Sequence, residues 1–319
     1  MKELSSCAVA DRDSKESSSA DLSVILVCWN NKDYLGPCLQ SLYECGLRRS
    51  FEVVVVDNGS TDGSQEMLRS EFPQVMLIQN AGNVGLGRAT NQGIQSTMGQ
   101  YVLLLNNDTL VNGASLNRMV DYLESTPTAG AVGGKLLNSD GSFQGAHAAF
   151  SSLLQEFLIA VRLGEFLWPG FPSHGDNAQE RAVDWLSSAC LLVRRKAFLE
   201  VGLLDEEYFI YGDETDFQFR LKKAGWKVYY LPDVTTLHYG GRSLDRWRRR
   251  KMVYRGKMLF YRKNYGRLSE FSLRLLLAGL SVVKMLPWGG AWLFPAWRTR
   301  AKRELQSNLG ILQLCWNLR

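Results

Sequence analysis

Four short apolar runs, each ending abruptly in polar residues, recur along the first hundred residues. Val102–Leu105 is apolar at every position, which is typical of a strand buried on both faces of a parallel sheet, and it stops at Asn106, Asn107 and Asp108. Residues at helical spacing follow the earlier runs, Leu22–Trp29, Phe51–Val56 and Val75–Ile78. Such strand–helix units, repeated about every 25 residues, predict an α/β fold with a mostly parallel, Rossmann-like central sheet flanked by helices.

Polar side chains gather where these predicted strands end. Asn30 follows the first strand, Asp57 the second and Asp108 the fourth. Open α/β sheets bind ligands at the carboxyl ends of their strands, and a hard carboxylate oxygen there suits a divalent cation that holds a diphosphate. An ordinary Asx turn would give the same local pattern, so this stretch alone leaves both interpretations open.

The loops after the strands exclude the simplest nucleotide-binding motif. No GxGxxG follows the first strand. Instead, Asn30 at the end of the first strand and Asp57 at the end of the second offer groups that can hydrogen-bond a base and a ribose. The third strand leads into a glycine-rich loop ending at Arg88. Gly85 and Gly87 in this loop either admit a phosphate or simply form a turn.

Composition indicates an ordinary globular protein. The 319 residues suffice for one large domain or two modest ones, and 45% hydrophobic and 22% charged residues are unremarkable values. The six cysteines form no CxxC pair, so we expect the reduced thiols of a cytosolic protein, with neither a disulfide framework nor a zinc site. Residues 1–20 are polar and Ser-rich, and we expect a disordered tail that is neither signal peptide nor anchor.

Beyond residue 113 the pattern loosens. Asp140-Gly141 is typical of a hairpin turn, and the stretch from Phe150 to Arg181 has no assignable pattern and could form a mobile loop over the site. The remaining predicted elements are helices over Gly113–Leu123 and Lys196–Val201 and strands over Ala131–Leu137, Val183–Val193 and Lys227–Leu231, the last ending at Pro232.

A second acidic cluster lies at residues 205–216. The apolar residues from Phe217 onward follow helical spacing, so Asp213 and Glu214 lie at a helix amino terminus, where the dipole favours ionised carboxylates. Helix capping alone would explain such a cluster. However, flanking aromatic residues such as Tyr211 offer stacking faces to a sugar and can raise a carboxylate pKa toward that of a base.

Basic residues dominate the segment 242–267, which holds eleven Lys and Arg against one Asp. No nucleic-acid-binding motif accompanies it, so we expect an anionic membrane surface or a lipid diphosphate as its partner; solvated helix charge is the alternative. His238 precedes this segment in a Gly-rich loop and becomes a reasonable metal or diphosphate ligand together with Asp108.

An apolar run, Leu275–Val283, follows the basic segment. It lies between Arg274 and Lys284 and is too short for a membrane span of about 20 residues. Tryptophans beyond it suit a membrane interface, so we expect peripheral association; they are Trp288, Trp292 and Trp297.

Together these stretches resemble family 2 glycosyltransferases of the GT-A fold, especially bacterial rhamnosyltransferase-like members. The resemblance covers about residues 21–245, between the tail 1–20 and a basic, amphipathic helical region 246–319. It rests on motifs in the expected order: Val27-Cys-Trp-Asn30, Val56-Asp-Asn-Gly-Ser-Thr-Asp62, Asn83-Val-Gly-Leu-Gly87 with Asn91-Gln-Gly93, Leu105-Asn-Asn-Asp-Thr109, Gly134-Lys-Leu-Leu137, Asp184-Trp-Leu-Ser-Ser-Ala-Cys190 and Tyr211-Gly-Asp-Glu-Thr-Asp-Phe217 ending in Arg220.

The resemblance implies a role for each part of the site. Asp57 would contact the nucleoside of a nucleotide-sugar, and residues 106–108 would occupy the DxD position that binds the metal diphosphate, with Mg²⁺ or Mn²⁺. His238 matches a histidine that can complete the metal site, and an acid of the Asp213-Glu214 pair would serve as base. Further expected donor contacts are Asn30, Asn83, Gly85, Arg88, Asn91, Asn106 and Asn107, and expected acceptor contacts are Trp185, Tyr211 and Asp216.

Two positions depart from the family pattern. Asn106 replaces the first acid of DxD, which leaves one carboxylate, Asp108, so metal affinity is low or depends on the bound diphosphate. The family more often has Glu then Asp where this chain has Asp213 then Glu214. Glu214, in the second place of the pair, is the first choice as base and Asp213 the fallback.

The expected reaction is a single displacement with inversion. A base removes the proton from an acceptor hydroxyl, which attacks the anomeric carbon as the nucleotide diphosphate leaves and the metal neutralises its charge. We expect transfer of a sugar, rhamnose by resemblance alone, to a glycan or lipid-linked glycan in cell-surface polysaccharide synthesis at the inner face of the cytoplasmic membrane. Nothing in the sequence sets the oligomeric state.

Two other functions remain open. A sugar-1-phosphate nucleotidyltransferase also has acids at strand ends, but it typically carries a Gly-rich loop with Arg or Lys after its first strand, and none is present near Asn30. A non-catalytic nucleotide-sugar-binding protein would show the same motifs.

Overall fold

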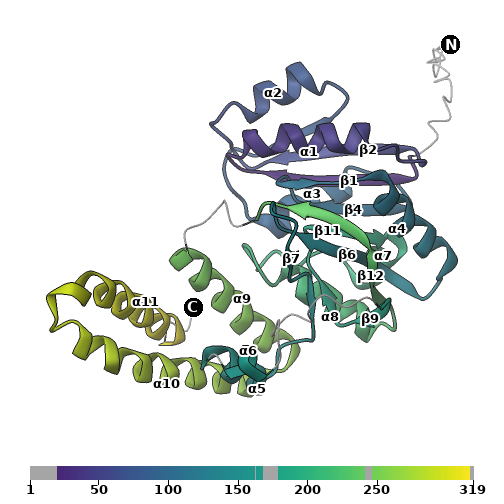
Figure 1. Cartoon of the computed structure of the whole chain (residues 1–319). Coiled ribbons are helices and arrows are strands. Elements are labelled where there is room, and N and C mark those ends of the chain that lie inside the picture. Colours follow the sequence, from purple (N-terminus) through teal and green to yellow (C-terminus); the bar gives the residue numbers. More distant parts are fainter. Residues whose placement is uncertain (1–19, 162, 168–178, 241–245, 317–319) are drawn as a thin grey trace, which may run out of the picture.

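The apolar runs of the sequence form one twisted sheet. The computed structural model describes residues 20–161, 163–167, 179–240 and 246–316, and Figure 1 shows their sheet with helices on both faces. The strand order is β3-β2-β1-β4-β11-β6-β12-β5. The strands of this path are β1 (Leu22–Cys28), β2 (Phe51–Asp57), β3 (Met76–Gln79), β4 (Tyr101–Leu105), β5 (Thr109–Leu110), β6 (Ala129–Leu137), β11 (Cys190–Arg194) and β12 (Lys227–His238).

Parallel pairing brings most carboxyl ends to one edge of the sheet. β1 pairs in parallel with both β2 and β4, and β6 pairs in parallel with β12. β11 is antiparallel to both of its neighbours, β4 and β6, so those two strands run in the same direction. The ends of β1, β2, β4 and β12 therefore lie along the same edge. The predicted mostly parallel sheet is confirmed, with one antiparallel strand near its centre.

Alternating strand residues supply two apolar cores, one on each face of the sheet. Leu35, Leu39 and Leu42 pack on one face with Leu103, while Leu104 and its alternates face the other core. Burying each such Leu side chain stabilises the fold by about 1.5–3 kcal/mol. The covering helices are α1 (Lys32–Glu44), α2 (Ser64–Glu71) and α4 (Gly113–Ser125) on the first face and α3 (Leu86–Gln95), α7 (Arg195–Val201) and α8 (Asp213–Lys223) on the second.

The strand predicted over Val183–Val193 is interrupted in the structure. It divides into β9 (Arg181–Val183), β10 (Trp185–Leu186) and β11, and β10 pairs with β8 (His147–Ala148) outside the main sheet. The chain turns at Asp184, whose carboxylate accepts a hydrogen bond from Phe150 N and pairs with Lys222. These contacts hold the segment away from a continuous strand.

β12 is longer than predicted. The strand does not end at Pro232, because the register shifts between Leu231 and Thr235 and pairing with β6 then resumes. This bulge accommodates a proline that cannot donate to the ladder. It also packs tightly on β6, since a Cβ on Gly134 would lie 2.3 Å from the Val234 carbonyl oxygen. His238 is consequently the last residue of a strand and not part of a loop.

The unassigned stretch after residue 150 contains helices. α5 (Leu153–Ala160) begins at a capping box formed by Ser152 and Gln155, and α6 (Leu163–Leu167) follows it. The predicted mobile loop is therefore wrong for these residues, while residues 168–178 lie outside the described part of the chain. The hairpin turn at Asp140-Gly141 is confirmed, because it joins β6 to β7 (Phe143–Gln144).

Three helices follow the sheet and extend away from it, at the lower left of Figure 1. They are α9 (Arg246–Asn264), α10 (Arg267–Ala291) and α11 (Arg298–Trp316), with the short helix η1 (Pro295–Trp297) before the last. The 25-residue α10 is long and apolar enough, by length and composition, to cross a membrane. The expectation that the apolar run Leu275–Val283 is too short thus needs correction, because the helix continues past Arg274 and Lys284.

One glycine lets α9 pack against the sheet domain. A Cβ on Gly256 would lie 2.2 Å from the Tyr211 carbonyl oxygen, and Tyr211 has a positive φ of 65°.

We expect Gly256→Ala to displace α9 and lower the melting temperature, because neither backbone can yield easily. Gly279→Ala in α10 is the control: nothing lies within 4 Å, so alanine should stabilise the helix by up to about 1 kcal/mol. Equal melting temperatures for the two variants would contradict this packing.

Candidate active site

Asp57 is the last residue of β2, and its two carboxylate oxygens differ in their hydrogen bonding within the described residues. Its Oδ1 accepts hydrogen bonds from Gly59 N, Ser60 N and the Gln65 side chain at 3.1, 3.0 and 2.6 Å. Its Oδ2 is buried without a hydrogen-bond partner within the described residues. A buried acceptor without a donor is costly, so this oxygen is suited to a donor supplied by a ligand.

Asn30 joins the loops after β1 and β2. Its backbone N donates to Ser60 Oγ at 2.9 Å, its side-chain oxygen accepts from Thr61 N at 2.7 Å, and its φ is positive at 50°. The Asn30 side-chain oxygen therefore holds the loop after β1 against the loop after β2. The Asn30 side-chain nitrogen remains available to a ligand.

Asn107 braces the neighbouring strands β1 and β4. Its side-chain nitrogen donates to the Val27 carbonyl at 2.7 Å, and its oxygen accepts from the Asn31 side chain. These bonds occupy the amide. Asn106 and Asp108, on either side, are left to form the site.

Asp108, Asn106 and His238 converge on one ring nitrogen. His238 Nε2 lies 3.2 Å from Asp108 Oδ1 and 3.2 Å from the Asn106 side-chain nitrogen. His238 Nδ1 lies 2.6 Å from Gln144 Oε1, while Gln144 Nε2 donates to Asn138 Oδ1 at 2.9 Å. Since Gln144 presents its oxygen, Nδ1 carries the hydrogen, and the lone pair of a neutral His238 is on Nε2.

This arrangement fits a divalent cation. A carboxylate and an imidazole lone pair facing each other favour a metal ion between them, and the hydrogen bond from Nδ1 to Gln144 is the kind that orients a metal-binding histidine. In the described part of the chain no third His, Cys, Asp or Glu joins them. The remaining ligands would come from the bound substrate or water.

The glycine-rich loop is held against the segment before α8. Asn83 Oδ1 accepts from Gly85 N at 3.0 Å, and Leu86 N donates to the Phe209 carbonyl at 2.7 Å. Gly85 has φ 94°, and a Cβ there would lie 2.9 Å from Phe209 O. Glycine is thus required by the close approach of two backbones.

Two expected donor contacts on α3 have structural partners. Asn91 is buried, and its amide binds both the carbonyl and the N–H of Leu204, at 2.8 and 3.0 Å. Arg88 is exposed and lies 3.9 Å from Glu206. Asn91 therefore anchors the segment before α8, and its geometry gives no support to a direct donor contact.

Asp213 lies at the start of α8 and faces the strand ends. It is 1% exposed, and its Oδ1 has no hydrogen-bond partner within the described residues. Asp213 lines a small cavity together with Asn106 and Ser188. Burial, and then the neighbouring Glu214 charge, raise the pKa of Asp213 well above its ordinary value.

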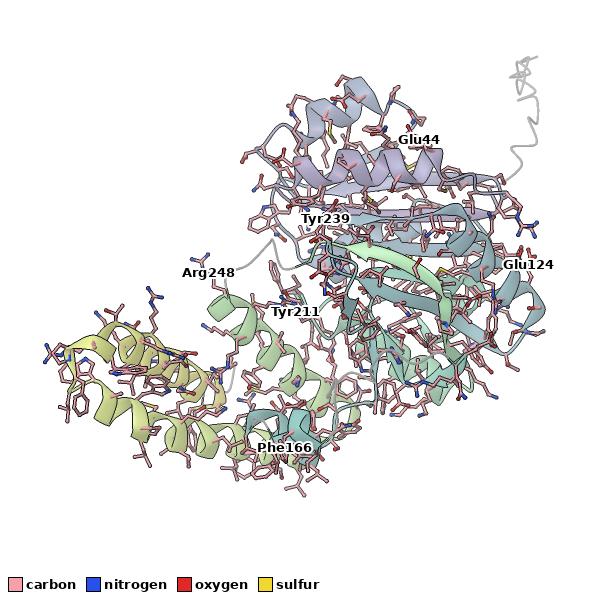
Figure 2. The ribbon with its side chains drawn as sticks, in the orientation of Figure 1. Glu44, Glu124, Phe166, Tyr211, Tyr239 and Arg248 are labelled. Atoms are coloured by element: carbon pink, nitrogen blue, oxygen red, sulfur yellow. The ribbon has the colours of Figure 1, made fainter. Side chains whose placement is uncertain are left out.

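Glu214, the next residue, lines a different pocket. This pocket of about 240 Å³ lies between the sheet domain and helices α5 and α9. Trp185, whose indole N–H donates to Ala149 O, and Tyr211 also line it. Figure 2 shows Tyr211 between the sheet and α9. The two adjacent acids thus line separate spaces, although their side chains are close enough for a hydrogen bond between them, which also raises the pKa of Asp213.

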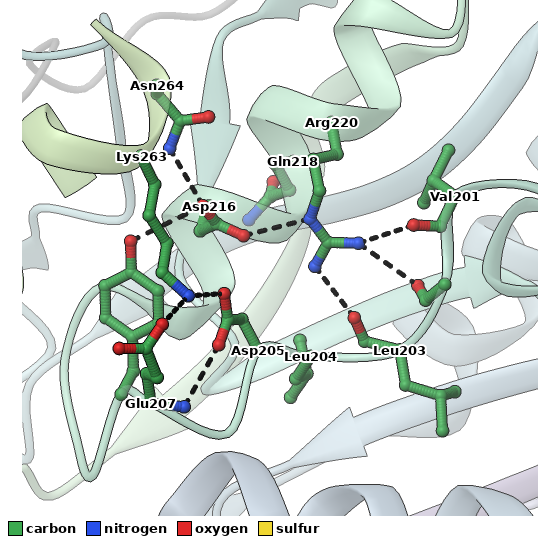
Figure 3. A network of polar contacts seen from close by, with 12 residues as sticks. Val201, Leu203, Leu204, Asp205, Glu207, Asp216, Gln218, Arg220, Lys263 and Asn264 are labelled. Atoms are coloured by element: carbon green, nitrogen blue, oxygen red, sulfur yellow. Dashed lines mark hydrogen bonds and ion pairs between the residues drawn. The ribbon is translucent and has the colours of Figure 1, made fainter. Parts of the chain in front are cut away.

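Asp216 faces away from both spaces. Its carboxylate accepts from Arg220 Nε at 2.9 Å, from the Asn264 side chain at 2.8 Å and from Tyr208 Oη at 3.4 Å (Figure 3). These bonds occupy both oxygens and tie α8 to α9. Asp216 thus links α8 to α9, and the acceptor contact expected there stays a prediction.

Sequence reasoning missed residues that complete the site. Gln144, which orients His238, follows a hairpin and carries no local signal. Glu156 and Lys257 form an ion pair at 2.7 Å in the Glu214 pocket, and they come from α5 and α9, far apart in sequence. Only the tertiary structure brings them together.

Comparison with known proteins identifies the family. The model of "Glycosyl transferase family 2" matches residues 23–202. The chain belongs to this family. As a member of family 2 it is a glycosyltransferase, as the sequence motifs predicted.

Curated relatives of this glycosyltransferase include rhamnosyltransferases. N-acetylglucosaminyl-diphospho-decaprenol L-rhamnosyltransferase of Mycobacterium tuberculosis is 34% identical over 242 residues, which cover 70% of this chain and 78% of the relative. Rhamnosyltransferase WbbL of Escherichia coli K12 is 23% identical over 225 residues, covering 68% and 82%. The predicted rhamnosyltransferase-like character is confirmed.

Solved structures confirm the GT-A fold. The mannosyltransferase PcManGT from Pyrobaculum calidifontis, solved with GDP-Man and Mn²⁺, has a TM-score of 0.58 at 16% identity and covers 95% of this chain and 89% of its own. GalNAc-T7, solved with UDP, GalNAc and Mn²⁺, has a TM-score of 0.53 at 18% identity, with 81% and 54% covered. Both neighbours contain a divalent cation, in keeping with the expected metal.

The raised pKa of Asp213 predicts a pH-dependent stability. Its folded pKa exceeds the unfolded value, so folding binds a proton, and the resulting stability is complete below the unfolded pKa and is lost as pH rises through the folded one. We expect Asp213→Asn to gain about 1 kcal/mol or more relative to wild type between pH 5 and pH 8 in urea unfolding. Asp33→Asn, an exposed acid in the first turn of α1, serves as control. A pH-independent difference for Asp213→Asn would show that its carboxyl ionises normally.

Proposed function

We propose that this enzyme transfers a sugar, rhamnose by analogy with its relatives, from a nucleotide-diphosphate sugar to a lipid-linked glycan, with inversion at the anomeric carbon. One observation carries the proposal: Asp213 faces the strand ends beside Asn106, while Glu214 faces a separate pocket. The start of α8 thus separates two spaces. We call the space at the strand ends the donor side and the Glu214 pocket the acceptor side.

The strand-end side is suited to the donor. The bare Asp57 oxygen would accept a hydrogen bond from the nucleoside, with Asn30 and the Asn83–Gly85 loop at the rim. The neighbours solved with GDP-Man and with UDP support a nucleotide-containing ligand. A second pocket with its own acid, Glu214, adjoins the donor side. This pocket favours a transferase over a non-catalytic nucleotide-sugar-binding protein.

Asp108 and His238 would hold Mg²⁺ or Mn²⁺. When bound, the cation neutralises the charge on the diphosphate leaving group. Because the chain supplies only these two ligands from its described acids, cysteines and histidines, the diphosphate itself would contribute to metal affinity. Gln144 keeps the His238 lone pair directed at the site.

The Glu214 pocket is suited to the acceptor sugar. Trp185 and Tyr211 offer aromatic faces, which commonly stack on the apolar faces of sugars. The Glu156–Lys257 ion pair also lines the pocket, and the partly exposed Lys257 ammonium offers a donor for hydroxyls. The pocket therefore combines stacking and hydrogen-bonding groups around one carboxylate.

Glu214 would act as the base. An Asp213 held neutral by burial does not repel the Glu214 carboxylate, which is left to take the proton of the attacking hydroxyl. Asp213, buried beside Asn106, would shape the donor side and exclude water. This division of roles favours the second acid of the pair as base.

We expect Glu214→Gln to lower the transfer rate by about 10²–10⁴-fold, the usual contribution of a general base, with donor affinity unchanged. The measurements are turnover with a polyprenyl-diphosphate-linked N-acetylglucosamine acceptor and calorimetric binding of the nucleotide-sugar. Glu207→Gln is the matched control, since this acid lies in the same segment but pairs with Arg262 and Lys263. Full turnover of Glu214→Gln would assign the base to another residue.

Residues 246–319 would attach the enzyme to the inner face of the cytoplasmic membrane. Leu268, Leu275 and Leu286 are exposed on α10, at spacings that keep them on one side of the helix. The opposite side packs on its neighbours through Leu273 and Leu277. Tryptophans and arginines at the far end suit the membrane interface, as in the contact of Arg298 with Trp292.

Flotation with anionic liposomes tests this attachment. We expect wild type to float at low salt and Val282→Glu/Leu286→Glu to remain in the pellet fraction, because two carboxylates on the apolar face oppose insertion. Gln95→Glu/Gln100→Glu, exposed on the sheet domain, adds the same charge and should still float. Absence of wild-type binding at low salt would refute the attachment.

A further inference from the structure

A large cavity lies among α5 and the three C-terminal helices. Its volume is about 1190 Å³, several times that of the Glu214 pocket. Its lining includes four cations and two aromatic residues from α9, α10 and α11: Arg250, Tyr254, Lys284, Trp288, Arg300 and Arg303. Among the described residues no strand of the main sheet lines the cavity, which is formed by the C-terminal helices together with Ile159 and Ala160 of α5.

Two arginines of the cavity, Arg250 and Arg300, are held in place by aromatic rings, and the described residues place no carboxylate within ion-pair distance of them. Arg300 lies over the rings of Trp288 and Trp297, at 5.5 and 5.7 Å, and Arg250 lies over Tyr254 at 5.6 Å. Arg250 also donates to Ser307 Oγ at 3.1 Å, which joins α9 to α11. Stacking of this kind restricts each guanidinium while leaving donors available.

The charge of the lining is strongly positive. Glu304 is the one acid among the lining residues of this cavity. Within the described residues, Arg250, Arg300 and Arg303 form no ion pair with a carboxylate. Unneutralised guanidinium groups around a cavity attract an anion, and their paired N–H donors match phosphate oxygens.

The cavity adjoins the Glu214 pocket. Ile159 of α5 lines both spaces. On α9, Arg250 lines the cavity and Val253, one turn later, lines the pocket. On α10, Lys284 and Trp288 face the cavity, whereas Leu286 is exposed on the outer side. The cavity thus stands between the acceptor pocket and the apolar surface.

We propose that this cavity binds the diphosphate of the lipid-linked acceptor. The sugar would enter the Glu214 pocket, the two phosphates would pair with Arg250, Arg300 and Arg303, and the lipid chain would leave along α10 toward the bilayer. This inference rests on the proposed lipid-linked acceptor and adds the site that recognises it. It also gives the basic helical region a specific ligand in place of a general attraction to charge.

Vesicle binding of the full chain tests the site. The probes are neutral phosphatidylcholine vesicles containing either a polyprenyl diphosphate or phosphatidylglycerol at matched surface charge. We expect Arg300→Gln/Arg303→Gln to weaken binding to the diphosphate vesicles by about tenfold or more, through lost charge-assisted hydrogen bonds, and binding to the phosphatidylglycerol vesicles far less.

The control is Arg255→Gln/Lys302→Gln, which removes the same charge from exposed positions on α9 and α11 outside the cavity lining. Equal losses in the two double variants, or equal binding of wild type to both vesicles, would overturn the diphosphate site in favour of bulk anionic lipid. Arg250→Lys keeps the positive charge but removes the paired N–H donors. It serves as a second variant if the double variant has a lowered melting temperature. Unchanged binding of Arg250→Lys to the diphosphate vesicles would also overturn the site. Calorimetric donor binding is measured in parallel, so failure of the transferase proposal is distinguished from failure of the cavity.

Discussion

The site depends on parallel pairing within the sheet. Because β1, β2, β4 and β12 all run in one direction, their polar carboxyl ends meet at one edge, although Cys28 at the end of β1 and His238 at the end of β12 are 210 residues apart. Asp57 and Asp108 lie along this edge because of the parallel strands, and the antiparallel pairing of β5 with β12, in which His238 lies opposite Thr109, then brings His238 to Asp108. A slip of one residue in β4 would exchange the side chains that face the two cores and displace Asp108 relative to His238.

A second constraint is the contact between α9 and the turn that opens α8. Gly256 allows the α9 backbone to approach the Tyr211 carbonyl, and Asn264 and Lys263 bind acids of the sheet domain. The acceptor side of the enzyme is consequently built from two regions, with Glu214 on one and Lys257 on the other. The sheet domain alone would lack the side of the pocket that α9 supplies.

Local patterns predicted most of the sheet and the family, and they failed where tertiary contacts decide. Strands Leu22–Cys28 and Tyr101–Leu105 are continuous apolar runs, so their positions followed from sequence. Asp216 shares a motif with Asp213, yet its orientation depends on Arg220 and Asn264, which no spacing reveals. The roles of Gln144 and of the Glu156–Lys257 pair likewise depend on segments that meet only in the folded chain.

The bulge at Pro232 separates two functions of one strand. Before it, β12 residues pack in the core; after it, the strand carries His238 to the edge of the sheet. Since pairing with β6 restarts at Thr235, the number of residues in the bulge sets the register of the second half of the strand. Because side chains alternate between the two faces of a strand, the insertion or loss of one bulge residue would turn the His238 imidazole to the other face and away from Asp108.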